Sequence, residues 1–142
     1  MGGQGDPDPE KVRAWCAFLA GLQGIALLAL GVAGIALNTG PPVPQLLGMQ
    51  LNMPHSVLLA VTGAGATTLL AWRRPLRWFL TAEFLVYLML FVYGSAVEAG
   101  TTRRSWLDTD TAGNFLHAGL STFSVALLLL IFLTPGAESR RT

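Results

Sequence analysis

Residues 55–97 read HSVLLAVTGAGATTLLAWRRPLRWFLTAEFLVYLMLFVYGSAV, two apolar runs separated by a short basic turn. The first run covers residues 55–72 and the second covers residues 76–97, with arginines around Pro75 between them. A helix rises about 1.5 Å per residue and a bilayer core is roughly 30 Å thick, so the first run is short but sufficient for a crossing and the second is ample. This stretch therefore predicts a transmembrane helical hairpin.

Two further apolar runs flank this hairpin, at residues 15–37 and 115–133. The composition agrees, since 52% of the 142 residues are hydrophobic and only 12% are charged. We therefore expect an all-α integral membrane four-helix bundle of up-down topology over residues 14–134. Residues 1–13 are predicted to form a disordered cytoplasmic leader, and residues 135–142 a cytoplasmic tail.

The two connecting segments that remain are polar or proline-rich. Residues 38–54 hold four prolines and no charge. We interpret them as an external loop with a short interfacial helix at residues 46–51. Residues 98–114 are polar and are placed on the same side of the membrane.

The orientation follows from the basic residues, because lysine and arginine near span ends are retained in the cytoplasm. Seven fall on one side of the predicted bundle and two on the other. The seven are Lys11, Arg13, Arg73, Arg74, Arg77, Arg140 and Arg141, and the two are Arg103 and Arg104. This distribution predicts a multi-pass protein of the plasma membrane with both termini cytoplasmic.

Several function classes are disfavoured by the sequence. A net charge of +1 without a basic face does not indicate nucleic-acid binding. The single cysteine, Cys16, gives no disulfide framework and no cysteine-based zinc site. The sequence contains no recognisable pair of catalytic carboxylates, nucleophile with its base, or phosphate-binding glycine loop. We therefore expect no enzymatic activity, no catalytic residues, no cofactor and no metal.

One group of polar residues lies within the predicted spans. Glu83 is about 9 Å along its helix from the cytoplasmic end, and Tyr87 lies one turn further on the same face. Gln23 and Ser124 have similar depths in their own spans, so we predict an intramembrane polar layer in which Gln23 contacts Glu83. Desolvation favours a neutral Glu83 that donates a hydrogen bond. Structural bonding, proton or ion coupling, and partner docking remain alternative roles for this layer.

The two histidines occur in matching contexts, Asn52-Met-Pro-His55 and Asn114-Phe-Leu-His117. We predict that each asparagine is a helix N-cap, with histidine at the third helical position and kept neutral by the positive end of the helix. Both histidines then lie at similar depth near the outer surface. Capping with interhelical hydrogen bonding, haem or metal ligation, and recognition of a lipid, quinone or partner are the readings that this placement leaves open.

Small residues mark two helix faces that allow close backbone approach. Ala17, Gly21 and Gly24 lie in the first span, and residues 63–66 (GAGA) lie in the second. Helices in lipid associate through such faces. We expect them to pack inside the bundle, with a homo-oligomer or partner interface as the alternative.

The stretches LLGMQLNMPHSVLLAVTG (residues 46–63) and DTDTAGNFLHAGLS (residues 108–121) resemble a family of small actinobacterial membrane proteins, the domain of unknown function 4383. The likeness covers residues 15–134, and the Asn and His pairs named above fit its pattern. Leu59 and Gly113 stand where that pattern has a second histidine and an acidic residue. These departures argue against a shared metal site. The resemblance implies the four-span fold and no particular activity.

Two functional hypotheses follow. The leading one is a non-catalytic accessory or scaffold subunit of a membrane assembly, whose partners are the lipid bilayer and another membrane protein or a second copy. The alternative is a ligand-handling protein. It would bind haem, quinone or lipid through His55 and His117, or act as a proton-coupled carrier through Glu83.

Overall fold

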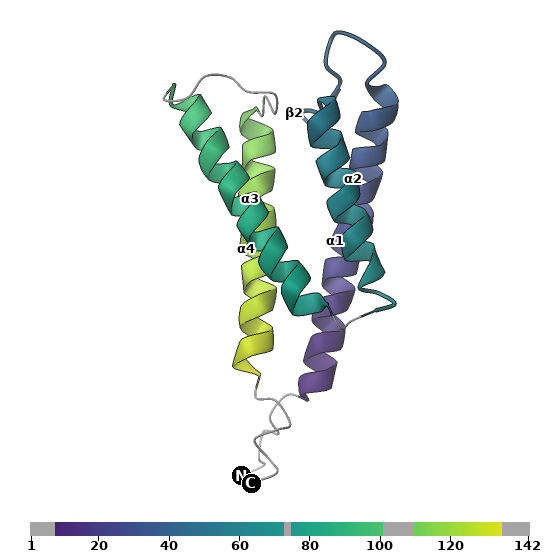
Figure 1. Ribbon diagram of the computed structural model, residues 1–142, viewed down its shortest axis with the longest axis vertical. Coiled ribbons are helices and arrows are strands. Elements are labelled where there is room, and N and C mark those ends of the chain that lie inside the picture. The colour runs from purple at the N-terminus through teal and green to yellow at the C-terminus, as the bar shows by residue number, and fades with distance from the viewer. Residues whose placement is uncertain (1–7, 73–74, 101–109, 135–142) are drawn as a thin grey trace.

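The computed structural model describes residues 8–72, 75–100 and 110–134, which form four helices and one two-stranded β-hairpin. The elements are α1 (Pro9–Leu37), β1 (Gln45–Leu46), β2 (Met49–Gln50), α2 (Met53–Thr68), α3 (Leu76–Glu98) and α4 (Thr111–Leu133). Successive helices run in opposite directions along the long axis (Figure 1). The predicted all-α fold with four helices is confirmed for the described residues.

The helices differ in their ability to cross a membrane. Among the described residues, α1, α3 and α4 are long and apolar enough to do so. Helix α2 has 16 residues, which is about 24 Å of helix. The prediction of a helical run to residue 72 is wrong, because α2 ends at Thr68 and the chain continues in turns whose N–H groups, including that of Trp72, bond back to residues 66–68.

Helix α1 begins earlier than predicted. Asp8 is its N-cap and accepts a bond of 3.0 Å from the Glu10 N–H, and Pro9 occupies the first helical position. The prediction of a disordered leader through residue 13 is therefore wrong for residues 9–13. An acidic cap followed by proline is a recognised helix start, and it allows a helix to begin here although the residues are mostly polar. Residues 1–7 and 135–142, the rest of the predicted leader and the tail, lie outside the described residues.

The segment after α1 forms a β-hairpin, so the predicted interfacial helix at residues 46–51 is wrong. Gln45 pairs with Gln50 and Leu46 with Met49. The two turn residues, Leu47 and Gly48, have φ values of 53° and 79°. Positive φ at both central positions gives the turn geometry that matches the twist of paired strands, and it is incompatible with a right-handed helix.

Helices α1 and α2 pack through glycine. A Cβ atom on Gly24 would lie 2.6 Å from the Ala66 Cβ atom, and one on Gly31 would lie 2.7 Å from the Ser56 carbonyl oxygen. A Cβ atom on Gly63 would lie 2.7 Å from the Gly24 carbonyl oxygen. Neighbours this close leave no room for a side chain. The small-residue faces predicted from the sequence are therefore used for packing inside the molecule.

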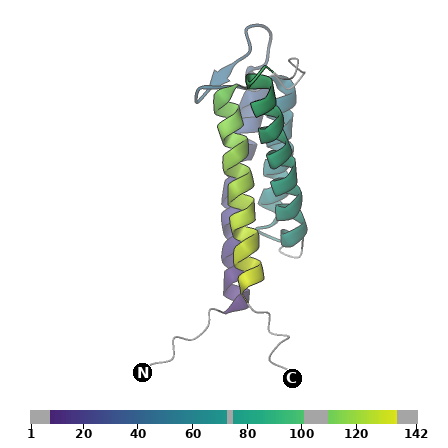
Figure 2. The ribbon, with the colours of Figure 1, turned by 90° about the vertical axis from the view of Figure 1, so that its left-hand side faces the viewer.

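The four helices form two tight hairpins that touch each other less closely. Helix α1 packs along α2 and α3 along α4, while contacts of α1 with α4 and of α2 with α3 are few. Figures 1 and 2 show the resulting elongated bundle. We call the interface between the two hairpins the seam. The end of the bundle where α1 begins and α4 finishes is called the terminal end. The opposite end carries the β-hairpin formed by β1 and β2 and is called the hairpin end.

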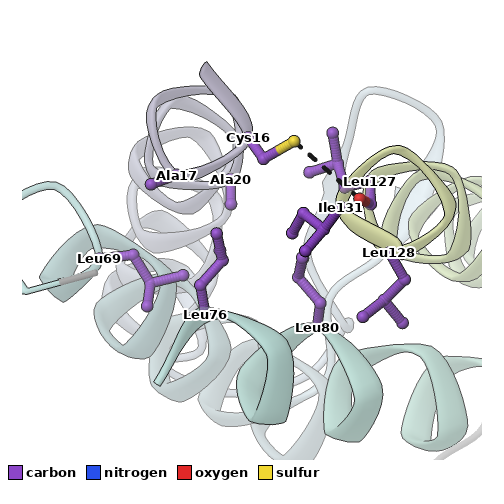
Figure 3. Packing of buried hydrophobic residues seen from close by; sticks show 9 residues of the cluster. All are labelled: Cys16, Ala17, Ala20, Leu69, Leu76, Leu80, Leu127, Leu128 and Ile131. Atoms are coloured by element: carbon purple, nitrogen blue, oxygen red, sulfur yellow. Dashed lines mark hydrogen bonds between the residues drawn. The ribbon is translucent and has the colours of Figure 1, made fainter. Parts of the chain in front are cut away.

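The seam has an apolar cluster in each half. The first apolar cluster fills the terminal half, where the Cys16 thiol also approaches the Leu127 carbonyl at 3.9 Å (Figure 3). It consists of Cys16, Ala17, Ala20, Leu69, Leu76, Leu80, Leu127, Leu128 and Ile131. The second apolar cluster lies nearer the hairpin end and consists of Leu27, Leu51, Leu59, Tyr87 and Leu120. Polar side chains are placed between and beside these clusters.

Candidate functional site

A hydrogen-bonded polar layer crosses the seam above the first apolar cluster. The Gln23 Nε2 group on α1 donates to Glu83 Oε1 at 2.7 Å, and the Ser124 hydroxyl on α4 donates to Glu83 Oε2 at 2.7 Å. Glu83 is 4% exposed and Ser124 is fully buried. The structure thus brings together the Gln23, Glu83 and Ser124 residues of the predicted layer. These three, from three helices, are called the polar layer below.

The predicted neutral state of Glu83 stays a prediction. In the orientation described, both carboxyl oxygens accept bonds, while the buried Gln23 Oε1 atom has no partner in the part of the chain that the structure describes. Rotation of the Gln23 amide by a half turn places its oxygen toward Glu83, and a neutral acid then donates to it. The heavy-atom geometry therefore accommodates a carboxylate and, after that rotation, a carboxylic acid.

Tyr87 was predicted to belong to the polar layer, but its ring lies against the histidines. The His117 and Tyr87 ring centroids are 5.6 Å apart, and those of His55 and His117 are 5.2 Å apart with an interplanar angle of 61°. All three side chains are fully buried. The predicted similar depth of the two histidines is thus accompanied by direct contact. His55 on α2, Tyr87 on α3 and His117 on α4 are called the His/Tyr cluster below.

The His/Tyr cluster is not satisfied by hydrogen bonds. Both ring nitrogens of His55, both of His117 and the Tyr87 hydroxyl have no partner among the described residues. Thr62 neighbours the Tyr87 hydroxyl and the Gln50 backbone neighbours His55, but neither contact has hydrogen-bond geometry. A buried polar atom without a partner costs about 1–3 kcal/mol, so five together require an explanation.

The two predicted N-caps have different outcomes. The Asn52 side chain accepts a bond of 2.9 Å from the His55 N–H, so Asn52 is the N-cap of α2. The prediction that Asn114 caps α4 is wrong. Helix α4 begins at Thr111, and its cap is Asp110, which accepts a bond of 2.8 Å from the Gly113 N–H.

Asp110, and not Asn114, is the N-cap of α4, and its carboxylate also bonds to the β-hairpin. Its second oxygen accepts a bond of 2.8 Å from the Gln50 N–H on β2. An anionic cap also interacts favourably with the positive end of the helix. Asn114, now one turn inside α4, bonds instead to α3: with its amide oriented to satisfy both ends, the oxygen accepts from the Ser95 hydroxyl at 3.1 Å and the NH₂ group donates to the Phe91 carbonyl at 3.0 Å. His117 is consequently nearly two turns from the start of α4 and not at the predicted third helical position.

The geometry bears on the cofactor alternatives. The His55 and His117 rings are in edge contact, so no gap for a porphyrin plane lies between them. Within residues 8–72, 75–100 and 110–134, no group of three or more His, Cys, Asp or Glu side chains is arranged to hold a metal ion. The arrangement offers hydrogen-bonding atoms in an apolar surrounding.

Comparison with known proteins gives one match. The family model described as "Domain of unknown function (DUF4383)" matches residues 17–130. The chain matches no curated protein and no solved structure. The family match spans most of the chain and agrees with the resemblance in the sequence. The protein therefore belongs to the DUF4383 family.

Proposed function

We propose that the chain is a multi-pass protein of the plasma membrane in which all four helices cross and both termini are cytoplasmic. Three apolar helices support membrane insertion. Every lysine or arginine among the described residues lies at the terminal end, namely Lys11, Arg13 and Arg77. The positive-inside rule then makes the terminal end cytoplasmic. The other arginines that favour this orientation lie outside the described residues.

The crossing of the short helix α2 follows from topology. Helix α1 finishes at the hairpin end and α3 begins at the terminal end. If α1 and α3 both cross, the segment between them must return through the same membrane. Helix α2 with the turns after it is that segment, and its close packing along α1 supplies the intramolecular contacts that a short span needs.

Within the membrane, we propose a non-catalytic accessory role in which α4 docks onto a helix of another membrane protein. The observation that carries this proposal is a stripe of small residues on the outer face of α4. Gly119, Thr122 and Ala126 are exposed on one helical face, and a Cβ atom on Gly119 would have nothing within 4 Å. The comparable faces of α1 and α2 are already used internally. This stripe offers close approach to a partner helix.

The test is affinity isolation of the full chain from its own membranes in mild detergent, followed by mass spectrometry. We expect a stoichiometric membrane partner with the natural sequence and its loss with Ala126→Leu. The matched control is Ala64→Leu, an equal enlargement at an exposed alanine on α2. Recovery of the chain alone, as a homo-oligomer, or with the partner equally retained by Ala126→Leu would contradict the proposal.

A further inference from the structure

We propose that the His/Tyr cluster binds the head of a lipid-soluble quinol or quinone whose tail lies in an apolar groove between α1 and α4. This goes beyond the accessory role and does not depend on it. The starting point is that five buried polar atoms from three helices, all fully enclosed, have no hydrogen-bond partner among the described residues. A molecule that pairs with these atoms removes a cost that no residue of the described chain removes.

The chemistry of the head follows from the atoms it must pair with. Each imidazole in its neutral form offers one donor and one acceptor, and the tyrosine hydroxyl offers both. A complementary head therefore needs oxygen acceptors for the imidazole N–H and tyrosine O–H groups, and it pairs the remaining ring nitrogens as well when it also carries donors. A quinol supplies both, a quinone supplies acceptors, and their planar rings match the aromatic faces of His117 and Tyr87. No electron transfer is part of this proposal.

The surrounding charges favour a neutral head. Within residues 8–72, 75–100 and 110–134 all lysines and arginines lie at the terminal end, so these residues offer no cation here to a phosphate or carboxylate head. The acidic side chain that interacts electrostatically with His55 is Asp110. Both Asp110 oxygens are occupied by the Gly113 and Gln50 N–H groups. Among the described residues, no group of three or more His, Cys, Asp or Glu side chains is arranged there to hold a divalent metal ion.

A route for the tail lies beside the cluster. A groove of about 440 Å³ is lined by α1, by the β-hairpin and by Leu116 of α4. Its lining includes Leu27, Leu30, Leu46 and Leu116, all of which pack in or against the second apolar cluster that contains Tyr87. Leucine side chains thus separate the groove from the polar atoms. The head reaches the cluster in this proposal only when these leucine side chains move, and the small number of contacts between the two helical hairpins is consistent with such movement.

The experiment uses the full chain in lipid nanodiscs with ¹⁵N-labelled histidine, since the sequence holds only two histidines. The probe is decyl-benzoquinone or its quinol, and the readout is the ring ¹⁵N resonances of His55 and His117. We expect both sets to shift on titration. Tyr87→Phe should weaken binding about fivefold, the equivalent of one hydrogen bond. Tyr93→Phe, on the same helix, is the matched control and should bind normally.

Two further titrations make the outcome decisive. Decyl phosphate carries the same tail with an anionic head, and Zn²⁺ carries no tail; neither should shift the histidine resonances. Leu116→Trp, which fills the groove without removing a polar atom, should reduce binding of the decyl probe. Absence of a shift with the quinol and quinone in folded protein overturns the proposal. A shift of the histidine resonances with Zn²⁺ alone or with decyl phosphate alone also overturns it. Equal loss of binding affinity in the Tyr87→Phe and Tyr93→Phe variants does the same.

Discussion

The polar layer and the His/Tyr cluster lie in the same seam, a turn or so apart, and differ in one respect. In the polar layer both carboxyl oxygens of Glu83 receive a bond of 2.7 Å and Gln23 Oε1 is the one buried atom without a partner among the described residues, whereas in the cluster all five polar atoms lack a partner there. Both are built from polar side chains on three helices and both are buried. The comparison shows that burial of polar residues in a bundle does not by itself mark a binding site. The distinguishing feature is whether the chain satisfies them itself.

The polar layer has a structural role that its contacts explain. Each hairpin is held internally by close helix packing, but few contacts join the hairpins. The bond from Gln23 to Glu83 therefore links α1 to α3 across the seam, and the bond from Ser124 to the same carboxyl group joins α4 to α3 within their own hairpin. The first apolar cluster closes the seam on the terminal side of this layer. Structural bonding is the role of Glu83 that these contacts support.

The largest change in stability is expected from Glu83→Ala in the polar layer. The substitution leaves the Gln23 amide and the Ser124 hydroxyl buried without an acceptor and removes a buried side chain. We expect a loss of about 2–4 kcal/mol in the free energy of unfolding, measured by denaturant titration in mixed micelles. Glu98→Ala on the same helix is the control, since Glu98 is exposed, and should change stability little. Equal stability of the two variants would refute the structural role.

A smaller effect is expected at the hairpin end, where Asp110 joins α4 to β2 beside the His/Tyr cluster. Asp110→Ala removes the N-cap bond to Gly113 and the bond to Gln50 together. We expect a loss of about 1–2 kcal/mol, and a loss of about 1 kcal/mol for the control Asp8→Ala, which removes a helix cap alone. Hydrogen exchange of the Gln50 amide should accelerate only in Asp110→Ala. Unchanged exchange there would show that the bond to β2 is dispensable.

The sequence predicted the features that depend on counting along regular helices. Apolar run lengths gave the four helices, and equal depth in different spans placed Gln23 and Ser124 at Glu83. Which of several nearby residues caps a helix, and which turn the chain adopts, was harder to predict. Two Asn-x-x-His motifs look alike, but only the second is preceded by an aspartate that can also bond to another element. The Leu47–Gly48 turn lacks the usual Asn-Gly signal, so the β-hairpin was missed. The contact between His117 and Tyr87 depends on how two helices rotate against each other, which spacing within one helix does not give.

The smallest effect, opposite in sign, is expected from Tyr87→Phe in protein freed of lipid-soluble ligands. The substitution deletes a buried hydroxyl that has no hydrogen-bond partner within residues 8–72, 75–100 and 110–134, while keeping the ring that packs against His117. Removing an unsatisfied group without altering shape should leave stability unchanged or raise it by up to about 1 kcal/mol. The same substitution weakens quinol binding in our proposal, so stability and binding should move in opposite directions. A loss of stability comparable to that of Glu83→Ala would mean that the hydroxyl is bonded within the chain, and the distinction between the two regions would then disappear.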